Sequence, residues 1–273
     1  MDLPTTTTLT LHLADGIADI RLARPDKSNA MNDAMWQEIR QAFEWVDATP
    51  AARVAVLSGE GRNFCAGIDL ALLAGIGQRI AHADGARSRE ALRRLILDLQ
   101  DCLSSLERCR KPVLAAIHGA CVGGALDLVT CCDMRYASAD AVFSVREIDV
   151  GMVADVGTLQ RLPRLVGEGM ARELAFTGRN VDAAEAGSLG LVNRVFATPE
   201  ALTAAVRDIA AAIAAKSPLA IRGIKEVMNF SRDHSVADGL QHVAMWNAAT
   251  LMSGDLQEAI AAQKEKRAPA FGD

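Results

Sequence analysis

The 273-residue chain is poor in the residues that mark several functional classes. Aromatic side chains make up 4% of it and the net charge is −5, which argues against a nucleic-acid partner. Five scattered histidines, and six cysteines without a CxxC pair, predict no metal site. The longest apolar run is interrupted by His and Asp, and the first residues lack a signal-peptide core. We therefore expect a cytoplasmic globular protein with reduced core cysteines and no membrane contact.

Strand and helix patterns alternate through the first part of the chain. Residues 9–22 predict a hairpin with an Asp-Gly turn, because leucines alternate with polar residues on one side of it. Residues 88–109 predict a long amphipathic helix, and residues 113–117 predict a buried strand. Residues 75–85 show no firm periodicity, and we expect a mobile loop there.

The composition changes near residue 198. Strands and helices alternate before it, whereas alanine-rich helical patterns dominate after Pro199. This change predicts an α/β core over residues 1–198, with the active site, and a helical region over residues 199–273.

A glycine pair precedes an apolar helix that contains Asp127. A turn at Gly123-Gly124 leaves the first N–H groups of that helix unpaired, with the positive end of the helix dipole behind them. Such groups can hold an anion or a developing oxyanion, and glycine lets a ligand approach closely. The alternative is a close-packed turn in which the helix dipole stabilises the acid.

Residues 64–70 form an apolar loop where a polar one would be ordinary. A buried loop must still satisfy its backbone groups, so this composition suggests that something else binds them. The N–H groups of Ile68 and Gly124 could meet at one carbonyl oxygen. The alternative is that the loop only fills the core.

Glu147 and Asp155 lie among hydrophobic residues with Gly151 between them. The chain can turn there and point both carboxylates into one cavity, where one acid removes a proton and the other delivers one. Clustered carboxylates in a low dielectric cannot all be ionised, so the group is expected to keep a proton near neutral pH. The alternative is a solvated surface where these acids pair with arginines. The candidate arginines are Arg146, Arg161 and Arg164.

Taken together, these segments resemble the crotonase superfamily, the enoyl-CoA hydratase/isomerase family. The resemblance covers nearly the whole chain. The matching segments, in order, are RPDKSNAMN, NFCAGIDL, HGACVGGALDL, CDMRYASADAVFSVREIDVG and GTLQRLPRLVG. Within the family the chain is most similar to the 3,5-2,4-dienoyl-CoA isomerases, above all through REIDVGMVADVGTLQRLP.

The resemblance implies a fold, an assembly and a set of catalytic roles. It implies an α/β spiral of repeated ββα units, with a helical C-terminal region that builds a homo-oligomer, either a trimer or a hexamer. It implies that the N–H groups of Ile68 and Gly124 form an oxyanion hole for a thioester oxygen. It also implies that Glu147 moves the proton at C2 and Asp155 the proton at C6, with Asp127 supporting the pair.

The same resemblance implies where coenzyme A binds. The expected contacts are mainly with backbone in two loops, at Lys27, Ser28, Ala30, Ala66, Gly67, Asp69 and Leu70. A cation near the C-terminus, Lys264 or Lys266, is a further candidate for a CoA phosphate. Coenzyme A is part of the substrate, and no separate cofactor or metal is expected.

The expected reaction moves the double bonds of a 3,5-dienoyl-CoA to the 2,4 positions. Enoyl-CoA hydratase is the alternative, but the hydratase pattern has Glu at the position of Asp127 and glycine at the position of Asp155. A different alternative is a non-catalytic acyl-CoA-binding protein of the same fold, which would not need the acids.

Overall fold

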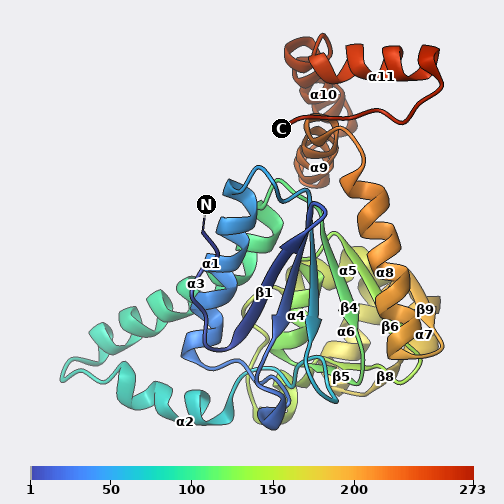
Figure 1. Cartoon of the computed structure of the whole chain (residues 1–273). Coiled ribbons are helices and arrows are strands. Elements are labelled where there is room, and N and C mark those ends of the chain that lie inside the picture. Colours follow the sequence, from blue (N-terminus) through green and yellow to red (C-terminus); the bar gives the residue numbers. More distant parts are fainter. Residues whose placement is uncertain (1) are drawn as a thin grey trace.

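Two β-sheets organise the body of the molecule, which a computed structural model describes over residues 2–273 (Figure 1). The strands are β1 (Leu9–Ala14), β2 (Ile17–Leu22), β3 (Val54–Gly59), β4 (Val113–Ile117), β5 (Ala120–Val122), β6 (Met134–Ser138), β7 (Val142–Ser144), β8 (Val181–Asp182) and β9 (Arg194–Phe196). Within residues 2–273, one sheet has the order β1-β2-β3-β4-β6-β9 and the other the order β5-β7-β8. The β1–β2 and β7–β8 pairs are antiparallel, and the remaining pairs are parallel.

Helices cover these sheets and continue beyond them. The α-helices are α1 (Asp33–Ala48), α2 (Leu70–Arg79), α3 (Gly85–Arg108), α4 (Gly124–Thr130), α5 (Thr158–Val166), α6 (Glu168–Thr177), α7 (Ala183–Ser188), α8 (Pro199–Ala214), α9 (Pro218–Arg232), α10 (Val236–Thr250) and α11 (Gly254–Glu265). Two short 3-10 helices are η1 (Pro25–Lys27) and η2 (Arg146–Val150). None of the helices in the described part of the chain is both long and apolar enough to cross a bilayer.

The path between the two sheets is a spiral. The chain passes from β4 in the larger sheet to β5 in the smaller one and then into α4, and β6 and β7 repeat the path directly alongside. Because β4 pairs with β6 and β5 pairs with β7, successive turns stack in register. The expected α/β spiral of ββα units is confirmed.

The larger sheet is buried on both faces. In β3, Val54 and Val56 face α8, whereas Ala55 and Leu57 face the main core, as the alternation of side chains along a strand requires. The fully buried α8 side chains in the cluster with Val54 and Val56 are Leu202, Val206 and Ala210. The helix that begins just after the proposed boundary at residue 198 therefore packs on the core, and the division into two parts stays a prediction.

Local signals in the first 60 residues act as expected. Asp15 and Gly16 both have positive φ, of 54° and 77°, which suits a two-residue hairpin turn. The Asn32 side chain accepts a hydrogen bond from the N–H of Met35 and caps α1.

All six cysteines are buried free thiols, as expected of core residues.

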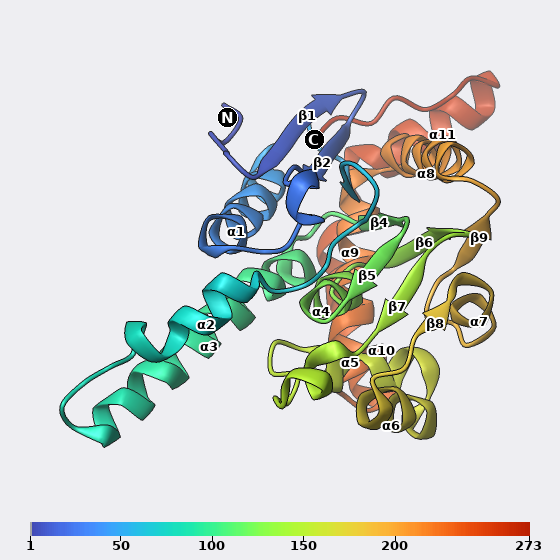
Figure 2. The same cartoon turned by 90° about the horizontal axis from the view of Figure 1, so that it is seen from below.

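The segment over residues 75–85, which has no firm periodicity in the sequence, is helical in its first half. The helix α2 runs to Arg79, and its N-terminus is capped by the Asp69 side chain. Gly75 and Gly77 hide the helical pattern in the sequence, but both lie where a Cβ would meet nothing within 4 Å. Helices α2 and α3 form an arm that projects from the body (Figures 1 and 2).

The C-terminal helices α9–α11 lie together at one end of the molecule, beyond α8 (Figure 1). One buried cation ties them to the core. The ammonium group of Lys225 on α9 donates to the carbonyl oxygens of Leu106 and Lys111, at 3.2 and 3.1 Å, and to the carboxylate of Asp133 at 2.7 Å. The Lys225 residue is 7% exposed.

Replacing Lys225 by Met is expected to lower the free energy of unfolding by about 3 kcal/mol, because it leaves a partly buried carboxylate and two carbonyl groups without their donor. Urea unfolding measures the change. Lys216→Met is the control, since that side chain is exposed and its loss is expected to change stability by less than about 0.5 kcal/mol. Equal stability of the two variants would contradict the anchoring role of Lys225.

Candidate active site

The glycine turn at the end of β5 leads directly into α4. Gly123 has φ of 57° and ψ of −130°, a conformation that strongly favours glycine, and its N–H donates to the carbonyl oxygen of Ser144 at 2.9 Å. The next residue, Gly124, begins the helix and is buried. Its N–H has no acceptor among residues 2–273, as is usual for the first turn of a helix.

The apolar loop before α2 lies against this turn. A Cβ added to Gly67 would lie 3.2 Å from the Gly124 nitrogen, and a Cβ added to Gly124 would lie 3.7 Å from the Ile68 nitrogen. The Ile68 N–H also has no acceptor in the described part of the chain. The structure therefore brings together the two N–H groups that the sequence analysis paired, and both are free to donate.

The Ile68 peptide is held by its neighbours. Met31 donates its N–H to the carbonyl oxygen of Gly67 at 2.8 Å and accepts from the N–H of Asp69 at 3.0 Å. The Ala66 N–H donates to the carbonyl oxygen of Ser28 at 2.9 Å. These bonds join the two loops that were expected to bind coenzyme A.

The expected coenzyme A residues thus share one surface region. Lys27, Ala66 and Leu70 are exposed, whereas Ser28, Ala30 and Asp69 are partly buried and Gly67 is buried. Lys264 lies in the last turn of α11 and Lys266 directly follows this helix, which is drawn at the other end of the molecule from α2 (Figure 1).

Arg24 and Asp69 form an ion pair between these loops that the sequence analysis missed. The guanidinium lies 3.0 Å from the Asp69 carboxylate and also donates to the carbonyl oxygen of Ala30. The N–H of Ala71 and the Arg24 guanidinium lower the pKa of Asp69. The only sequence signal was the position of Arg24 in the RPDKSN segment, which does not reveal a partner 45 residues away.

Asp127 is fully buried on α4. One of its oxygens, Oδ1, accepts a hydrogen bond of 2.5 Å from the N–H of Thr158, the first residue of α5. The other oxygen, Oδ2, is buried and has no hydrogen-bond partner among the described residues. Burial raises the pKa of Asp127, although the Thr158 donor opposes the shift.

Glu147 lies on η2, against the glycine turn. A Cβ added to Gly123 would lie 3.5 Å from Oε1 of Glu147. Burial, and then the negative charge of Asp127, raise the pKa of Glu147 to about 7. Its Oε2 is buried without a donor, and the pKa values of the Glu147 and Asp127 side chains depend on each other. Two carboxylates cannot donate to each other, so this pair forms a hydrogen bond only when it holds a proton.

Asp155 lies between η2 and α5 and belongs to the same cluster. Burial raises its pKa, and its charge contributes to the raised pKa values of both Asp127 and Glu147. Gln100 on α3 donates to the backbone carbonyl of Asp155 at 2.6 Å, a contact that sequence patterns did not indicate. The three acids therefore share one electrostatic environment.

The arginines offered as surface partners of these acids are engaged elsewhere, which removes that alternative. Arg146 pairs with Asp149, Arg161 with Glu107, and Arg164 with Asp233. Among residues 2–273, no group of three or more His, Cys, Asp or Glu side chains is arranged to hold a metal ion.

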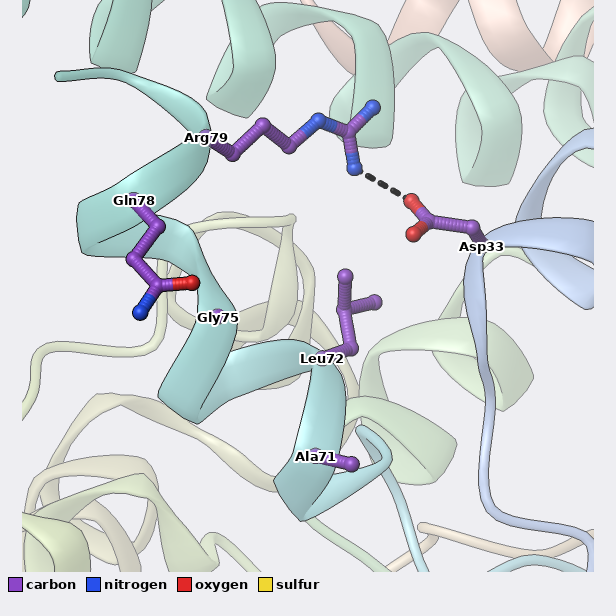
Figure 3. A pocket seen from close by; sticks show the side chains of 6 residues that line it. All are labelled: Asp33, Ala71, Leu72, Gly75, Gln78 and Arg79. Atoms are coloured by element: carbon purple, nitrogen blue, oxygen red, sulfur yellow. Dashed lines mark hydrogen bonds and ion pairs between the residues drawn. The ribbon is translucent and has the colours of Figure 1, made fainter.

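A separate cavity of about 430 Å³ lies on α2 (Figure 3). It is lined by Asp33, Ala71, Leu72, Gly75, Gln78 and Arg79. Arg79 reaches across to form an ion pair with Asp33 at its edge (Figure 3). None of the three clustered acids lines this cavity, so it is distinct from the acid cluster.

Comparison with known proteins decides the family. The family model of enoyl-CoA hydratase/isomerase matches residues 12–273. The chain belongs to the enoyl-CoA hydratase/isomerase family. It is 49% identical to the peroxisomal Δ(3,5)-Δ(2,4)-dienoyl-CoA isomerase of Arabidopsis thaliana, over 91% of this chain and 90% of that protein. It is 44% identical to the mitochondrial Δ(3,5)-Δ(2,4)-dienoyl-CoA isomerase of Homo sapiens, over 92% of this chain and 77% of that protein.

The fold of this family member agrees with that of solved structures. The crystal structure of an enoyl-CoA hydratase from Bacillus anthracis matches it with a TM-score of 0.88 and 30% identity, over 97% of this chain and 99% of that one. The family resemblance expected from the sequence motifs is confirmed.

The expectation of a cytoplasmic location is wrong by the same comparison. The two relatives described above are named as a peroxisomal and a mitochondrial enzyme. The expectation rested on the cysteine pattern and on the lack of a signal-peptide core, and neither property distinguishes the cytosol from the interior of an organelle.

Replacing Glu147 by Gln is expected to stabilise the protein at alkaline pH. Because the pKa of Glu147 is raised from 4.5 to about 7 in the folded state, ionisation favours unfolding, and stability is lost as pH rises between these values. The variant has no carboxyl group at this position and does not lose stability in this way. Its Tm is therefore expected to exceed that of the wild type by a few degrees at pH 8 and by much less at pH 4.5. Calorimetry at both pH values measures the difference.

Glu168→Gln is the matched control, because Glu168 is exposed and pairs with Arg172, which lowers its pKa. This second substitution is expected to give no increase in Tm at pH 8. A Glu147→Gln protein with the same Tm difference at both pH values would show that the folded state does not disfavour the ionised Glu147.

Proposed function

We propose that the protein isomerises a 3,5-dienoyl-CoA thioester to the 2,4-dienoyl-CoA. The proposal is carried by one observation, the clustering of Glu147 and Asp155 with a third buried acid beside two main-chain N–H groups that have no acceptor. The names of the Arabidopsis and human relatives support it. Movement of a double bond requires a proton to leave one carbon and another to arrive further along, which suits two acids in one site.

The reaction begins at the thioester oxygen. The N–H groups of Ile68 and Gly124 hold this oxygen, and each such donor lowers the barrier by roughly 3–4 kcal/mol as negative charge develops. Ionised Glu147 removes a proton from C2, and the electron pair of that C–H bond delocalises through the carbonyl and the conjugated carbons to give a dienolate. Protonation at C6 by Asp155 then fixes the double bonds at positions 2 and 4.

Asp127 sets the base strength of Glu147. Its charge is one of the causes of the raised pKa of Glu147, and a base with a pKa near 7 is both available at neutral pH and strong enough to attack carbon acids. Asp127 therefore acts through Glu147 rather than on the substrate.

The loops joined by the Ser28–Ala66 hydrogen bond are the proposed binding region for coenzyme A. They support backbone contacts with the substrate at the positions expected from the sequence, next to the oxyanion hole. No cofactor beyond the coenzyme A portion of the substrate enters this mechanism.

We also propose that the chain forms a trimer or hexamer through its C-terminal region. Large apolar side chains are exposed on α9, α10 and the turn that follows them, as expected of a surface that another copy covers. These residues are Ile224, Met228, Leu240, Met245 and Met252.

Hydration of a 2-enoyl-CoA is the second candidate, since the Bacillus anthracis neighbour is an enoyl-CoA hydratase. Asp127 is one methylene shorter than the glutamate of the hydratase pattern and would hold a catalytic water less closely. Asp155 gives a reason to prefer isomerisation, because water addition at C3 has no use for an acid further along the chain. A non-catalytic acyl-CoA-binding role would leave the buried acids without a function to offset their cost.

Glu147→Gln and Asp155→Asn are each expected to lower kcat on a 3,5-dienoyl-CoA by about 100-fold or more, the usual contribution of a positioned acid or base. The increase in ultraviolet absorbance as the diene becomes conjugated with the thioester carbonyl measures the rate. Asp149→Asn is the matched control, because Asp149 is an exposed carboxylate two residues after Glu147 that pairs with Arg146.

The hydratase alternative predicts a different result in the same experiment. Fast hydration of crotonyl-CoA that survives Asp155→Asn, together with no turnover of 3,5-dienoyl-CoA, would replace the isomerase proposal. Tight binding of acyl-CoA without either reaction would favour the non-catalytic role.

The pH dependence of kcat/KM is expected to follow the ionisation of Glu147. Because the base must be ionised and its pKa is about 7, activity is expected to rise with pH through this value, and to fall again where Asp155 loses the proton that it delivers to C6. Asp127→Asn removes a negative neighbour and is expected to move this limb to lower pH. A limb near the ordinary glutamate value of 4.5 in the wild type would contradict the assigned base.

A further inference from the structure

Thr158 stands where α5 meets the acid cluster. It is the first residue of the helix, it is 1% exposed, and its N–H donates to Oδ1 of Asp127 at 2.5 Å. Its hydroxyl is buried and has no hydrogen-bond partner among the described residues, but it lowers the pKa of Asp127 and so lies close to that carboxyl group. One buried donor, the Thr158 hydroxyl, and one buried acceptor, Oδ2 of Asp127, thus both lack a partner, in two residues that are already joined by a backbone hydrogen bond.

The other groups around Asp127 cannot replace this donor. Glu147 and Asp155 are acids that repel its negative charge. The thiols of Cys121 and Cys131, on β5 and after α4, are buried, which raises their pKa values and keeps them neutral. The Arg161 guanidinium, one turn along α5, is bound to Glu107.

We propose that Thr158 is a positioning residue that keeps Asp127 as a carboxylate, so that Glu147 is the member of the pair that gains and loses the proton. This proposal rests on the proposed isomerase function. The N–H and the hydroxyl of Thr158 both belong to the N-terminus of α5, where the helix dipole also favours a negative charge, and a rotation of the hydroxyl lets it donate to Asp127 as well. The neutral member of the pair can then be Glu147, which lies beside the oxyanion hole and needs to exchange its proton with C2.

Loss of the Thr158 hydroxyl is expected to shift the pKa values of Asp127 and Glu147 in opposite directions. A hydrogen bond to a charged oxygen stabilises the carboxylate, so its removal makes Asp127 hold a proton more readily. A protonated Asp127 no longer repels charge on Glu147, which then ionises at lower pH and becomes a weaker base. The base-limited rate therefore falls while the acidic limb of the pH profile moves down.

Thr158→Val keeps the shape and the backbone N–H but removes the hydroxyl. We expect the acidic limb of kcat/KM on 3,5-dienoyl-CoA to move down by about one pH unit, and kcat at pH 8 to fall several-fold with KM unchanged. Thr158→Ser, which restores the hydroxyl, is expected to return the limb to the wild-type position. In an Asp127→Asn background, Thr158→Val is expected to shift nothing further.

Thr130→Val is the matched control, because the Thr130 hydroxyl is also buried but donates to the backbone carbonyl of Asp127 at 2.8 Å. The acidic limb of the kcat/KM profile of Thr130→Val is expected to coincide with that of the wild type. Thr158→Ala serves as the second variant if valine perturbs folding, which circular dichroism and thermal unfolding report. The proposal would be overturned if the acidic limb of the kcat/KM profile stayed in place or moved to higher pH in folded Thr158→Val or Thr158→Ala. It would also be overturned if Thr130→Val moved this limb by the same amount.

Infrared titration separates this proposal from the function. The carbonyl stretch of a protonated buried carboxyl is measured against pH in the wild type, Thr158→Val and Asp127→Asn, without substrate. The Thr158→Val spectrum is expected to gain a band that Asp127→Asn removes. This result would support the role of Thr158 even in a protein that fails to turn over 3,5-dienoyl-CoA, whereas normal turnover without the new band would overturn it.

Discussion

The burial of three carboxyl groups close together is the constraint on which the rest of the site depends. Removing a carboxylate from water is costly, and a second negative charge nearby adds to the cost. The chain meets this cost with few donors, chiefly the first residue of α5 at Asp127. The part of this cost that the donors do not offset raises the pKa of Glu147. Reactivity at neutral pH and strain in the folded state therefore have the same physical source.

The spiral explains how these groups meet main-chain donors. In each ββα unit the chain leaves the smaller sheet at the end of a strand. After β5 it leaves through glycines, which allow the backbone to approach the neighbouring loop. Gly67 has φ of 88°, and a Cβ there would lie 2.7 Å from the carbonyl oxygen of Val122. A side chain at this position would push the two loops apart. The close approach of the Ile68 and Gly124 nitrogens thus depends on the absence of side chains as well as on the hydrogen bonds that hold the Ile68 peptide.

The sequence predicted those parts of the structure that depend on short-range patterns. The hairpin, the cap at Asn32 and the glycine turn before α4 follow from neighbouring residues, and the family motifs brought the three acids together. Helix α2 was missed because two glycines, Gly75 and Gly77, weaken its pattern, although the Asp69 side chain caps its N-terminus. The Arg24–Asp69 pair and the donor at Thr158 were missed because each joins residues more than 30 positions apart.

The position of the proton, more than the number of acids, separates the candidate reactions. A hydratase needs two acids that share one water, so a symmetric pair suffices. An isomerase that moves charge along a conjugated chain needs one acid that accepts a proton beside the thioester and another that delivers one further away. The N–H of Thr158 makes the cluster asymmetric, because it donates to Asp127, whereas Glu147 has its pKa raised to about 7. An asymmetric cluster with a third acid at Asp155 is what the longer proton transfer requires.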